Sequence, residues 1–321
     1  MWAAVDQLSA KNLIMKAAYI EAQGSPEVLQ YGNVLDPIES LGKAVVDIHA
    51  ASVNAADWKV RSGAIGPIKN FPYILGRDFS GVVRTIGDDV LDVAVGDEVF
   101  GVCEIGQEGA YAEKIAIKSS ILASKPKNLS HLEAAALAAT GLTALISIED
   151  TIKLVAGETI LIQGGAGGVA GLAIQLAKQI GAYVITTASA TNHDYLRDLG
   201  ADECIDYTTQ EFTERVSGCD AVFETVGGKV AMRSFEVLRP GGRIAFIASG
   251  PIAPNPLRDD ITALRPTVNR DRIHLDSIVD LFSTGAIRTP EISTFHLQEA
   301  AKAHRISESR HARGKLVFKV R

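Results

Sequence analysis

The sequence predicts an α/β protein in which a domain built on a parallel sheet is joined to a mostly β domain. The length of 321 residues is enough for two domains of ordinary size. Fourteen of the 29 glycines lie between Gly157 and Gly250, where they separate short apolar runs. Apolar runs of about five residues that alternate with helical patterns are typical of βαβ units in a parallel sheet.

The first part of the chain, from about Met15 to residue 125, is predicted to be mostly β. Its apolar and β-branched stretches are joined by turns such as Gly87-Asp88-Asp89. Residues 1–14 lack the charge and apolar pattern of a signal peptide, so we expect a loose N-terminal extension there. The expected strands are residues 16–21, 43–52, 81–86, 98–100 and 111–117.

A helix is expected to connect the two domains. Ser130 is followed three residues later by Glu133, and this pair is a capping box, the signature of a helix N-terminus. The apolar residues that follow predict a helix to about Ala139, and residues 143–148 continue the helical pattern.

The segment after this helix carries strand and helix patterns in regular alternation. The sequence Arg239-Pro240-Gly241-Gly242 is interpreted as a stop before the last strand of the series. Residues 315–320 also have a strand pattern and are expected to return to the first domain. The expected strands of the series are residues 159–163, 183–187, 203–207, 221–224 and 243–247, and the expected helices are residues 169–180, 193–199, 211–216 and 230–237.

A glycine-rich loop follows the first strand of this series. Gly165, Gly167 and Ala170 fit the dinucleotide-binding pattern G-x-G-x-x-G/A, in which the first glycine permits a tight turn and the second lets the backbone approach a pyrophosphate. The helix that follows offers free N–H groups and a partial positive charge to phosphates. A glycine-rich turn that binds nothing is the alternative. The expected phosphate-binding residues are Gly165, Ala166, Gly167, Gly168 and Val169.

The end of the second strand favours NADPH over NADH. Residues 187–192 read Thr-Ala-Ser-Ala-Thr-Asn and contain no carboxylate. An NAD site usually places Asp or Glu here to bind the ribose hydroxyls, and such a charge would repel a 2′-phosphate. NADPH is therefore the expected cofactor, and an NAD site built on another contact is the alternative.

Composition and charge exclude several classes of function. A net charge of −6 means that the chain has no excess of positive charge with which to bind nucleic acid or an anionic membrane. The sequence has no run of 18 uncharged apolar residues, so no transmembrane helix is expected. Three cysteines without metal-ligand spacing favour a reducing, cytoplasmic location. The seven histidines show no ligand spacing either, and His304 and His311 are interpreted as surface residues.

Several motifs outside the glycine loop are shared with one known family. They are Ala51 to Gly63, Gly76 to Val83, Gly96 to Gly101, Gly109 to Glu113, Thr140 to Ala144 and Gly314-Lys315. Together with the loop, they make the chain from Met15 onward resemble the zinc-independent quinone oxidoreductase (zeta-crystallin-like) branch of the medium-chain dehydrogenase/reductase superfamily.

This resemblance implies the domain arrangement and the activity. The expected fold is α/β, with a Rossmann-type doubly wound parallel sheet domain, residues 138–284, inserted in a GroES-like mostly β domain, residues 15–137 and 285–321. The implied function is an NADPH-dependent reductase that transfers hydride to a quinone or an α,β-unsaturated carbonyl (enone or enal) without a metal. The implied assembly is a homodimer.

No metal is expected. Zinc alcohol dehydrogenases of the superfamily hold catalytic zinc with Cys, His and Cys. The resemblance implies that the matching positions in this sequence are Asn54, Arg77 and the segment 134–143, which contains no cysteine. An arginine cannot ligate zinc because it has no lone pair to offer. The lobe of four closely spaced cysteines that holds a structural zinc is also missing.

Without a metal, the cofactor carries the chemistry and the protein positions the substrate. Asn54 is the first candidate to contact a substrate oxygen or the nicotinamide ribose, and a turn cap is its alternative. Asp57 is expected to orient Asn54 or Lys59. Lys59 stands where better-known quinone reductases have tyrosine, and this departure favours an enone as the substrate. Its ammonium could donate to the developing oxyanion. A solvated surface lysine is the alternative. Tyr73 and Arg77 are weaker candidates for substrate contact.

The remaining cofactor contacts are implied by the resemblance. Ser189, Tyr207 and Arg310 match positions near the 2′-phosphate, with packing or solvation as the alternatives for Tyr207 and Arg310. Thr143 is expected to reach the phosphates or nicotinamide from the connecting helix, and Lys315 to add positive charge. The backbone of Ala248 and Ser249 ends a strand at the ligand-binding edge of the sheet. A non-catalytic NADPH-binding protein of the same fold and a zinc alcohol dehydrogenase are the competing functions.

Overall fold

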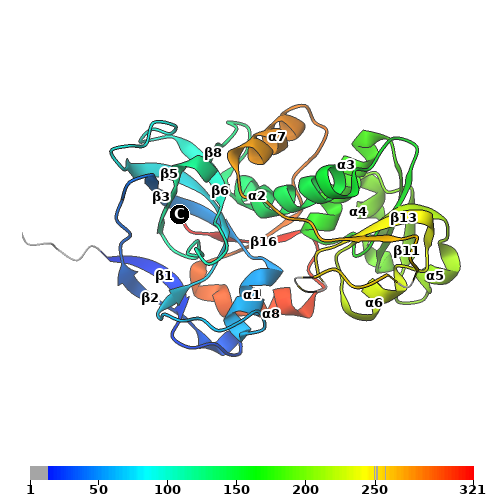
Figure 1. The fold of residues 1–321 in the computed structure, drawn as a ribbon. Helices are drawn as coiled ribbons and strands as arrows, with labels where there is room; N and C mark the ends of the chain where they lie inside the picture. Colours follow the sequence, from blue (N-terminus) through cyan, green and yellow to red (C-terminus); the bar gives the residue numbers. More distant parts are fainter. Residues whose placement is uncertain (1–13, 249, 251, 257) are drawn as a thin grey trace, which may run out of the picture.

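The computed structural model describes residues 14–248, 250, 252–256 and 258–321, which form two lobes connected through the helix α2 (Figure 1). The first strand begins at Ile14, two residues before the predicted strand and one residue before the predicted start of the domain. The rest of the predicted 1–14 extension and the cofactor candidate Ser249 lie outside the described residues.

One lobe contains a six-stranded sheet in which every neighbouring pair of strands is parallel. Its strand order is β11-β10-β9-β12-β13-β14, which corresponds to 3-2-1-4-5-6 along the chain. This is the order of a doubly wound Rossmann sheet, so the predicted fold of this lobe is confirmed. The strands are β9 (Thr159–Ile162), β10 (Tyr183–Ala188), β11 (Glu203–Asp206), β12 (Cys219–Glu224), β13 (Leu238–Phe246) and β14 (Thr262–Leu264).

Helices cover both faces of this sheet because successive strand residues point to opposite sides. Ile160 and Ile162 of β9 face a core shared with α2 and α3, whereas Leu161 between them faces the core that contains Phe212 of α5. The helices are α3 (Gly168–Ile180), α4 (His193–Asp198), α5 (Phe212–Arg215) and α6 (Gly228–Arg233), and α7 (Arg272–Ser283) packs on α2.

The strand β13 corrects one expectation. The residues 239–242 do not end the preceding element as predicted but lie inside β13. Cys219 of β12 pairs with Leu238 and Ala221 pairs with Arg243, so the intervening residues form an irregularity between two paired ends. The exposed residues 239–241 therefore form a bulge while the strand continues.

The other lobe is mostly β, as predicted, and it contains two sheets. The tail strand β16 pairs antiparallel with β3, with Phe318 opposite Ala51, so the end of the chain returns to the first domain as expected. Two helices accompany the sheets, α1 (Ala55–Ser62) and α8 (Ala300–Ser309). The strands are β1 (Ile14–Ile20), β2 (Leu29–Leu35), β3 (Lys43–Ser52), β4 (Tyr73–Ile74), β5 (Asp78–Ile86), β6 (Glu98–Val102), β7 (Lys114–Lys118), β8 (Ala123–Ser124), β15 (Ile292–Phe295) and β16 (Lys315–Lys319).

The helix α2 (His131–Leu145) packs against both lobes. Its predicted capping box is present: the backbone N–H of Glu133 donates to Ser130 Oγ at 3.2 Å, and the N–H of Ser130 donates to Glu133 Oε2 at 2.8 Å. Leu137 packs in the core of the parallel-sheet lobe, whereas Ala135 and Ala136 pack against β3 and β16. The predicted domain boundary at residues 137/138 falls inside α2 and stays a prediction.

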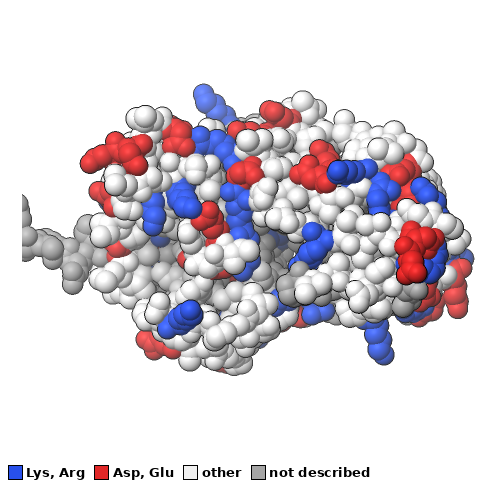
Figure 2. All heavy atoms as spheres, in the orientation of Figure 1, with Lys and Arg blue, Asp and Glu red and all other residues white. Residues whose placement is uncertain are grey.

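The helical segment His131–Ile152, which continues α2 with a π-helical turn, is long and apolar enough to cross a membrane. Seventy-two per cent of its apolar window is buried inside the protein, as in the core helix of a globular fold. On the face shown in Figure 2, Lys and Arg side chains are interspersed with Asp and Glu. This face presents no large patch of one charge.

Candidate functional site

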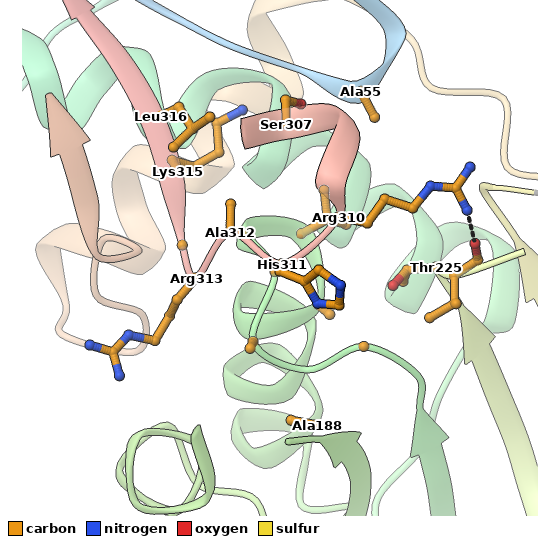
Figure 3. Close-up of a pocket in the computed structure, with 18 of the residues that line it drawn as sticks. Ala55, Ala188, Thr225, Ser307, Arg310, His311, Ala312, Arg313, Lys315 and Leu316 are labelled. Carbon is orange, nitrogen blue, oxygen red and sulfur yellow. Dashed lines mark hydrogen bonds between the residues drawn. The ribbon is translucent and has the colours of Figure 1, made fainter. Parts of the chain in front are cut away.

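A cavity of about 710 Å³ opens at the carboxyl ends of β9, β10 and β12, where the two lobes meet. In a doubly wound sheet this is the place where the strand order reverses and ligands bind. The segment that links α8 to β16 forms another wall (Figure 3). The lining comprises residues 53–55, 58–59, 140, 164, 166–170, 187–189, 191–192, 207, 225–226, 247–248, 291, 293, 307 and 310–316.

The glycine loop after β9 lies in this cavity and leads into α3. Its positive φ of 70° is at Gly164, so the tight turn falls one residue before the predicted position. Position 165 requires glycine for a different reason: it has no space for a side chain, because a Cβ there would lie 2.2 Å from Thr186 Oγ1. Gly167 is the N-cap of α3, and Ala170 is buried in the core behind it. The first N–H groups of α3 have no partner within the helix and are available to a phosphate.

The adenosine side of the cavity is polar and carries no carboxylate in residues 187–192. Ser189 Oγ accepts a hydrogen bond of 2.9 Å from Asn192 Nδ2 and lies 3.2 Å from Thr191 Oγ1. Tyr207, 52% exposed, lines the same side after β11. These groups fit a phosphorylated ribose because hydroxyl groups donate to phosphate oxygens and residues 187–192 carry no carboxylate that would repel them.

Arg310 lines the same cavity as Ser189 and Tyr207, and its contacts lie on the side of β12 and α1. It ends α8 in the left-handed conformation, with φ of 60°. Its guanidinium donates to Val226 O at 3.4 Å, after β12, and points away from Ala188 at the end of β10 (Figure 3). It also lies 6.0 Å from the centre of the Trp58 ring.

Asn54 lines the cavity at the N-terminus of α1, and both ends of its amide are held. Nδ2 donates to Asp78 Oδ1 at 2.8 Å, and Oδ1 accepts from Lys315 Nζ at 2.8 Å. Asp78 and Lys315 are both buried. Burial raises the pKa of Asp78 and lowers that of Lys315, and each charge opposes the shift of the other. Asn54 is therefore more than a turn cap: it is the neutral link between two buried charged groups.

Asp57 contacts the backbone of Asn54 and does not line the cavity. Its Oδ2 accepts the backbone N–H of Asn54 and the hydroxyl of Tyr111, both at 2.8 Å. Burial raises the pKa of Asp57 to about 6, opposed by the charge of Arg77. Behind Tyr111, Nε2 of His304 lies 3.3 Å from the hydroxyl oxygen. The interpretation of His304 as a surface residue was wrong, because its side chain is completely buried.

The substrate candidates Tyr73 and Arg77 do not line the cavity. Arg77 forms an ion pair with Glu108 at 3.0 Å, and the Tyr73 hydroxyl donates to the same carboxylate. Burial and Glu108 together raise the pKa of Tyr73. Both side chains belong to a polar cluster beside Asp57, where they have protein partners.

Lys59 lines the cavity and is half-buried, so it is not a fully solvated lysine. Its ammonium lies 5.6 Å from the centre of the Trp58 ring. Burial lowers the pKa of Lys59, and the charge of Arg310 lowers it further. A half-desolvated ammonium at the cavity wall can stabilise or protonate an anionic oxygen.

The helix α2 presents Thr140 to the cavity rather than the predicted Thr143. The Thr143 hydroxyl donates to Ala139 O of its own helix at 2.7 Å. Of the other predicted contacts, Ala248 lines the cavity, and Lys315 does so while donating to Asn54. The sequence reasoning missed Trp58, whose signal was its position between Asp57 and Lys59 in a shared motif.

Within the part of the chain that the structure describes, no group of three His, Cys, Asp or Glu side chains lies close enough to hold a metal ion. Cys103 and Cys219 are buried and Cys204 is half-buried; all three are free thiols. Burial raises the pKa of Cys219 to about 12.

Comparison with known proteins identifies the family. The alcohol dehydrogenase GroES-like domain matches residues 40–127, and the zinc-binding dehydrogenase domain matches residues 199–318. The Arabidopsis thaliana NADPH-dependent alkenal/one oxidoreductase, which is chloroplastic, is 31% identical over 94% of this chain and 79% of its own. The quinone oxidoreductase structure from Coxiella burnetii is 37% identical, with a TM-score of 0.91 over 96% of this chain and 100% of its own. The Escherichia coli quinone oxidoreductase complexed with NADPH is 25% identical, with a TM-score of 0.87 over 95% of this chain and 100% of its own.

The fold, the phosphate loop and these similarities define an NAD(P)H-dependent oxidoreductase. The chain belongs to the medium-chain dehydrogenase/reductase superfamily, in its quinone oxidoreductase branch. The predicted family, the α/β fold with its GroES-like and Rossmann domains, and NADPH as the cofactor are thereby confirmed.

Proposed function

We propose that the protein is a metal-free reductase that transfers hydride from NADPH to a quinone or an α,β-unsaturated carbonyl compound. The observation that carries this proposal is the position of Asn54, whose amide is fixed between Asp78 and Lys315 at the wall of the cavity that contains the phosphate loop. NADPH, when bound, supplies the hydride. Conjugated acceptors need little further activation, because the added charge spreads to an oxygen distant from the attacked carbon.

The residues of this chain bind, orient and supply a proton. The N–H groups at the start of α3 hold the phosphates, and the polar residues after β10 hold the ribose. Asn54 keeps one amide hydrogen free among its hydrogen bonds to the described residues, and this hydrogen donates to the substrate oxygen as negative charge develops there. Lys59 then delivers the proton, which it regains from solvent, so one hydride and one proton reduce each acceptor.

The surroundings of Asn54 and Arg77 support chemistry without zinc. The only amide atom of Asn54 that could ligate a metal is Oδ1, and it accepts from Lys315. Arg77 is directed to Glu108 and Asp57. Stoichiometric zinc in the purified protein, measured by elemental analysis, would overturn this part of the proposal.

An enone or enal is the favoured acceptor class, and a quinone is the second. The observation behind this preference is Lys59, an ammonium with a lowered pKa at the cavity wall, because an enolate is a stronger base than a hydroquinone anion and gains more from a nearby proton donor. The similar alkenal/one oxidoreductase agrees with this class, and the similar quinone oxidoreductase structures support the second.

Initial rates with NADPH and with NADH, against a panel of quinones, enals and enones, test the proposal. We expect turnover with NADPH at least tenfold more efficient than with NADH. Fluorescence titration of NADPH in the same preparation separates a catalyst from a non-catalytic binding protein. Tight binding of NADPH without turnover of any acceptor would show that the protein is a non-catalytic binding protein.

The working form is proposed to be a homodimer in the cytoplasm. The described partners of β14 all lie on its β13 side, and an open strand edge can extend a sheet across two copies. The free thiols favour a reducing compartment. Light scattering coupled to gel filtration tests the dimer, and cell fractionation tests the location.

A further inference from the structure

We propose that Lys315 is a positioning residue: it fixes the orientation of the Asn54 amide and ties that orientation to the phosphate loop. The sequence suggested that Lys315 adds charge for the cofactor phosphates, and the contacts of its ammonium argue against that role. The inference rests on the proposed function, in which Asn54 donates to the substrate.

The ammonium of Lys315 is occupied by protein acceptors. Nζ donates to Val53 O and to Asn54 Oδ1, both at 2.8 Å, and only 5% of the residue is exposed. An ammonium carries three hydrogens and no lone pair, so two of its three donors are directed to the start of α1. A group held in this way has only one donor left for a phosphate.

The neighbours of Asn54 allow only one orientation of its amide. Lysine can only donate, so it must face Oδ1; the Asp78 carboxylate accepts, so it must face Nδ2. Asp78 is itself fixed, because it accepts from the Ser52 hydroxyl at 2.8 Å and from the Ala139 N–H at 3.3 Å. With one Nδ2 hydrogen committed to Asp78, the direction of the second is set by geometry. Removal of Lys315 leaves Oδ1 without its donor, so the amide keeps only its hydrogen bond to Asp78 and its direction is less tightly set.

The same lysine packs against the start of α3. The residue before it, Gly314, donates its N–H to Ala166 O at 2.9 Å and forms a β-bridge with Gly167. A Cβ on Gly168 would lie 2.9 Å from both Cγ and Cδ of Lys315. The methylene groups of Lys315 therefore touch the loop that holds the cofactor phosphates, while its ammonium holds the amide that contacts the substrate. Lys315 therefore influences both the position of the cofactor and the direction of the Asn54 amide.

The central test compares Lys315→Met with the wild-type enzyme. Methionine keeps the length and the apolar contacts and removes the ammonium. We expect the NADPH dissociation constant, from fluorescence titration, to stay within about twofold, while kcat falls by about 100-fold, the typical cost of a 1 Å misplacement. A tenfold weaker NADPH affinity with an unchanged kcat would show a phosphate ligand and overturn the proposal.

A second comparison asks whether Lys315 acts through Asn54. We expect Asn54→Ala and the double variant Asn54→Ala/Lys315→Met to have the same kcat within about twofold, because the amide that Lys315 positions is already gone. Multiplied losses in the double variant would mean that Lys315 acts independently of Asn54, and the proposal would be wrong.

Stability requires a matched control, because Lys315→Met leaves the buried Asp78 without its nearby charge. Lys125 is a second buried lysine, and its Nζ donates to Leu129 O at 2.6 Å and Pro126 O at 3.1 Å, outside the cavity lining. Lys125→Met should lower the melting temperature and leave kcat unchanged. The double variant Asp78→Asn/Lys315→Met removes both charges; it should recover stability and keep the low kcat.

One readout does not depend on turnover. In protein labelled with ¹⁵N-asparagine, the side-chain amide signals of Asn54, assigned by their loss in Asn54→Ala, should shift when NADPH is added to the wild type. The shift should be smaller in Lys315→Met, where the ammonium that ties the amide to the phosphate loop is gone. If the wild type binds NADPH and shows this shift but reduces no acceptor, the proposed function fails and the positioning role stands. An unchanged Asn54 signal in wild type, or the same shift in both proteins, contradicts the coupling.

Discussion

The hydroxyl of Tyr111 donates a hydrogen bond of 2.8 Å to Oδ2 of Asp57, the same oxygen that accepts the backbone N–H of Asn54. His304 contacts that hydroxyl through Nε2. Burial raises the pKa of Asp57 to about 6 and lowers the pKa of His304 to about 3. Two groups that meet at one hydroxyl therefore make the stability of the protein depend on pH in opposite directions.

The first prediction concerns His304. In the folded protein it stays neutral down to about pH 3, whereas in the unfolded chain it gains a proton below about 6.5. The unfolded state therefore binds more protons, and stability decreases as the pH falls. Between pH 7 and pH 5 this one group should cost about 2 kcal/mol. Urea denaturation at both pH values should show that His304→Gln loses less stability than the wild type; equal losses would remove His304 as the cause.

The second prediction concerns Asp57, for which the sign is reversed. The folded protein holds the Asp57 proton up to about pH 6, whereas the unfolded chain releases it near 3.8. The stability that Asp57 contributes is complete below pH 3.8 and is lost as the pH rises through 6, by about 3 kcal/mol in total. Asp57→Asn should gain stability relative to the wild type between pH 4 and pH 7 in the same assay. A difference that stays constant with pH would contradict the raised pKa.

Two glycines of the phosphate loop should respond differently to alanine. Gly165→Ala places a methyl group 2.2 Å from Thr186 Oγ1 and should cost about 1–3 kcal/mol of stability. At Gly167 the nearest atom is Gly164 O at 3.5 Å and φ is −75°, so alanine fits. Gly167→Ala should fold normally and bind NADPH about tenfold more weakly, because the backbone can no longer approach the pyrophosphate. Normal NADPH affinity in Gly167→Ala would place the phosphates elsewhere.

Ser189 should decide between the two nicotinamide cofactors. Ser189→Asp introduces a carboxylate at the end of β10, where a 2′-phosphate would be repelled and ribose hydroxyls would be bound. The NADPH dissociation constant should rise at least about tenfold, and that of NADH should stay equal or fall. Ser189→Ala is the matched control and should change NADPH binding much less. If Ser189→Asp weakens both cofactors equally, Ser189 does not lie at the 2′ position.

The phosphate loop could be predicted from the sequence because it is local. Strand, glycines and helix follow one another within about 25 residues, and their order has few interpretations. The tight turn was predicted at Gly165 but lies at Gly164, and the sequence could not separate the two positions because both residues are glycine. The residue type alone does not show whether a positive φ or a lack of space requires the glycine. In the same way, Thr140 and Thr143 lie one turn apart on α2, and helical periodicity does not show which turn is level with the cavity.

The surroundings of Asn54 could not be predicted in this way. Lys315 is 261 residues away, and a lysine at the start of a strand is most often exposed. The prediction for His304 failed for a related reason. The helix α8 is polar around most of its surface, and only the packing of His304 on Tyr111 reveals that His304 is buried. Such contacts depend on how distant segments meet, which local patterns do not encode.

The return of β16 to β3 has a consequence for the order in which the protein matures. The Rossmann sheet is one continuous stretch of chain, whereas the partners of Asn54 come from 24 and 261 residues away. Closing the longer of these loops carries the greater entropic cost and comes late in folding. During refolding, weak affinity for NADPH should therefore appear once the Rossmann sheet has formed, whereas full affinity and turnover should follow only when β16 closes the cavity wall at residues 310–316.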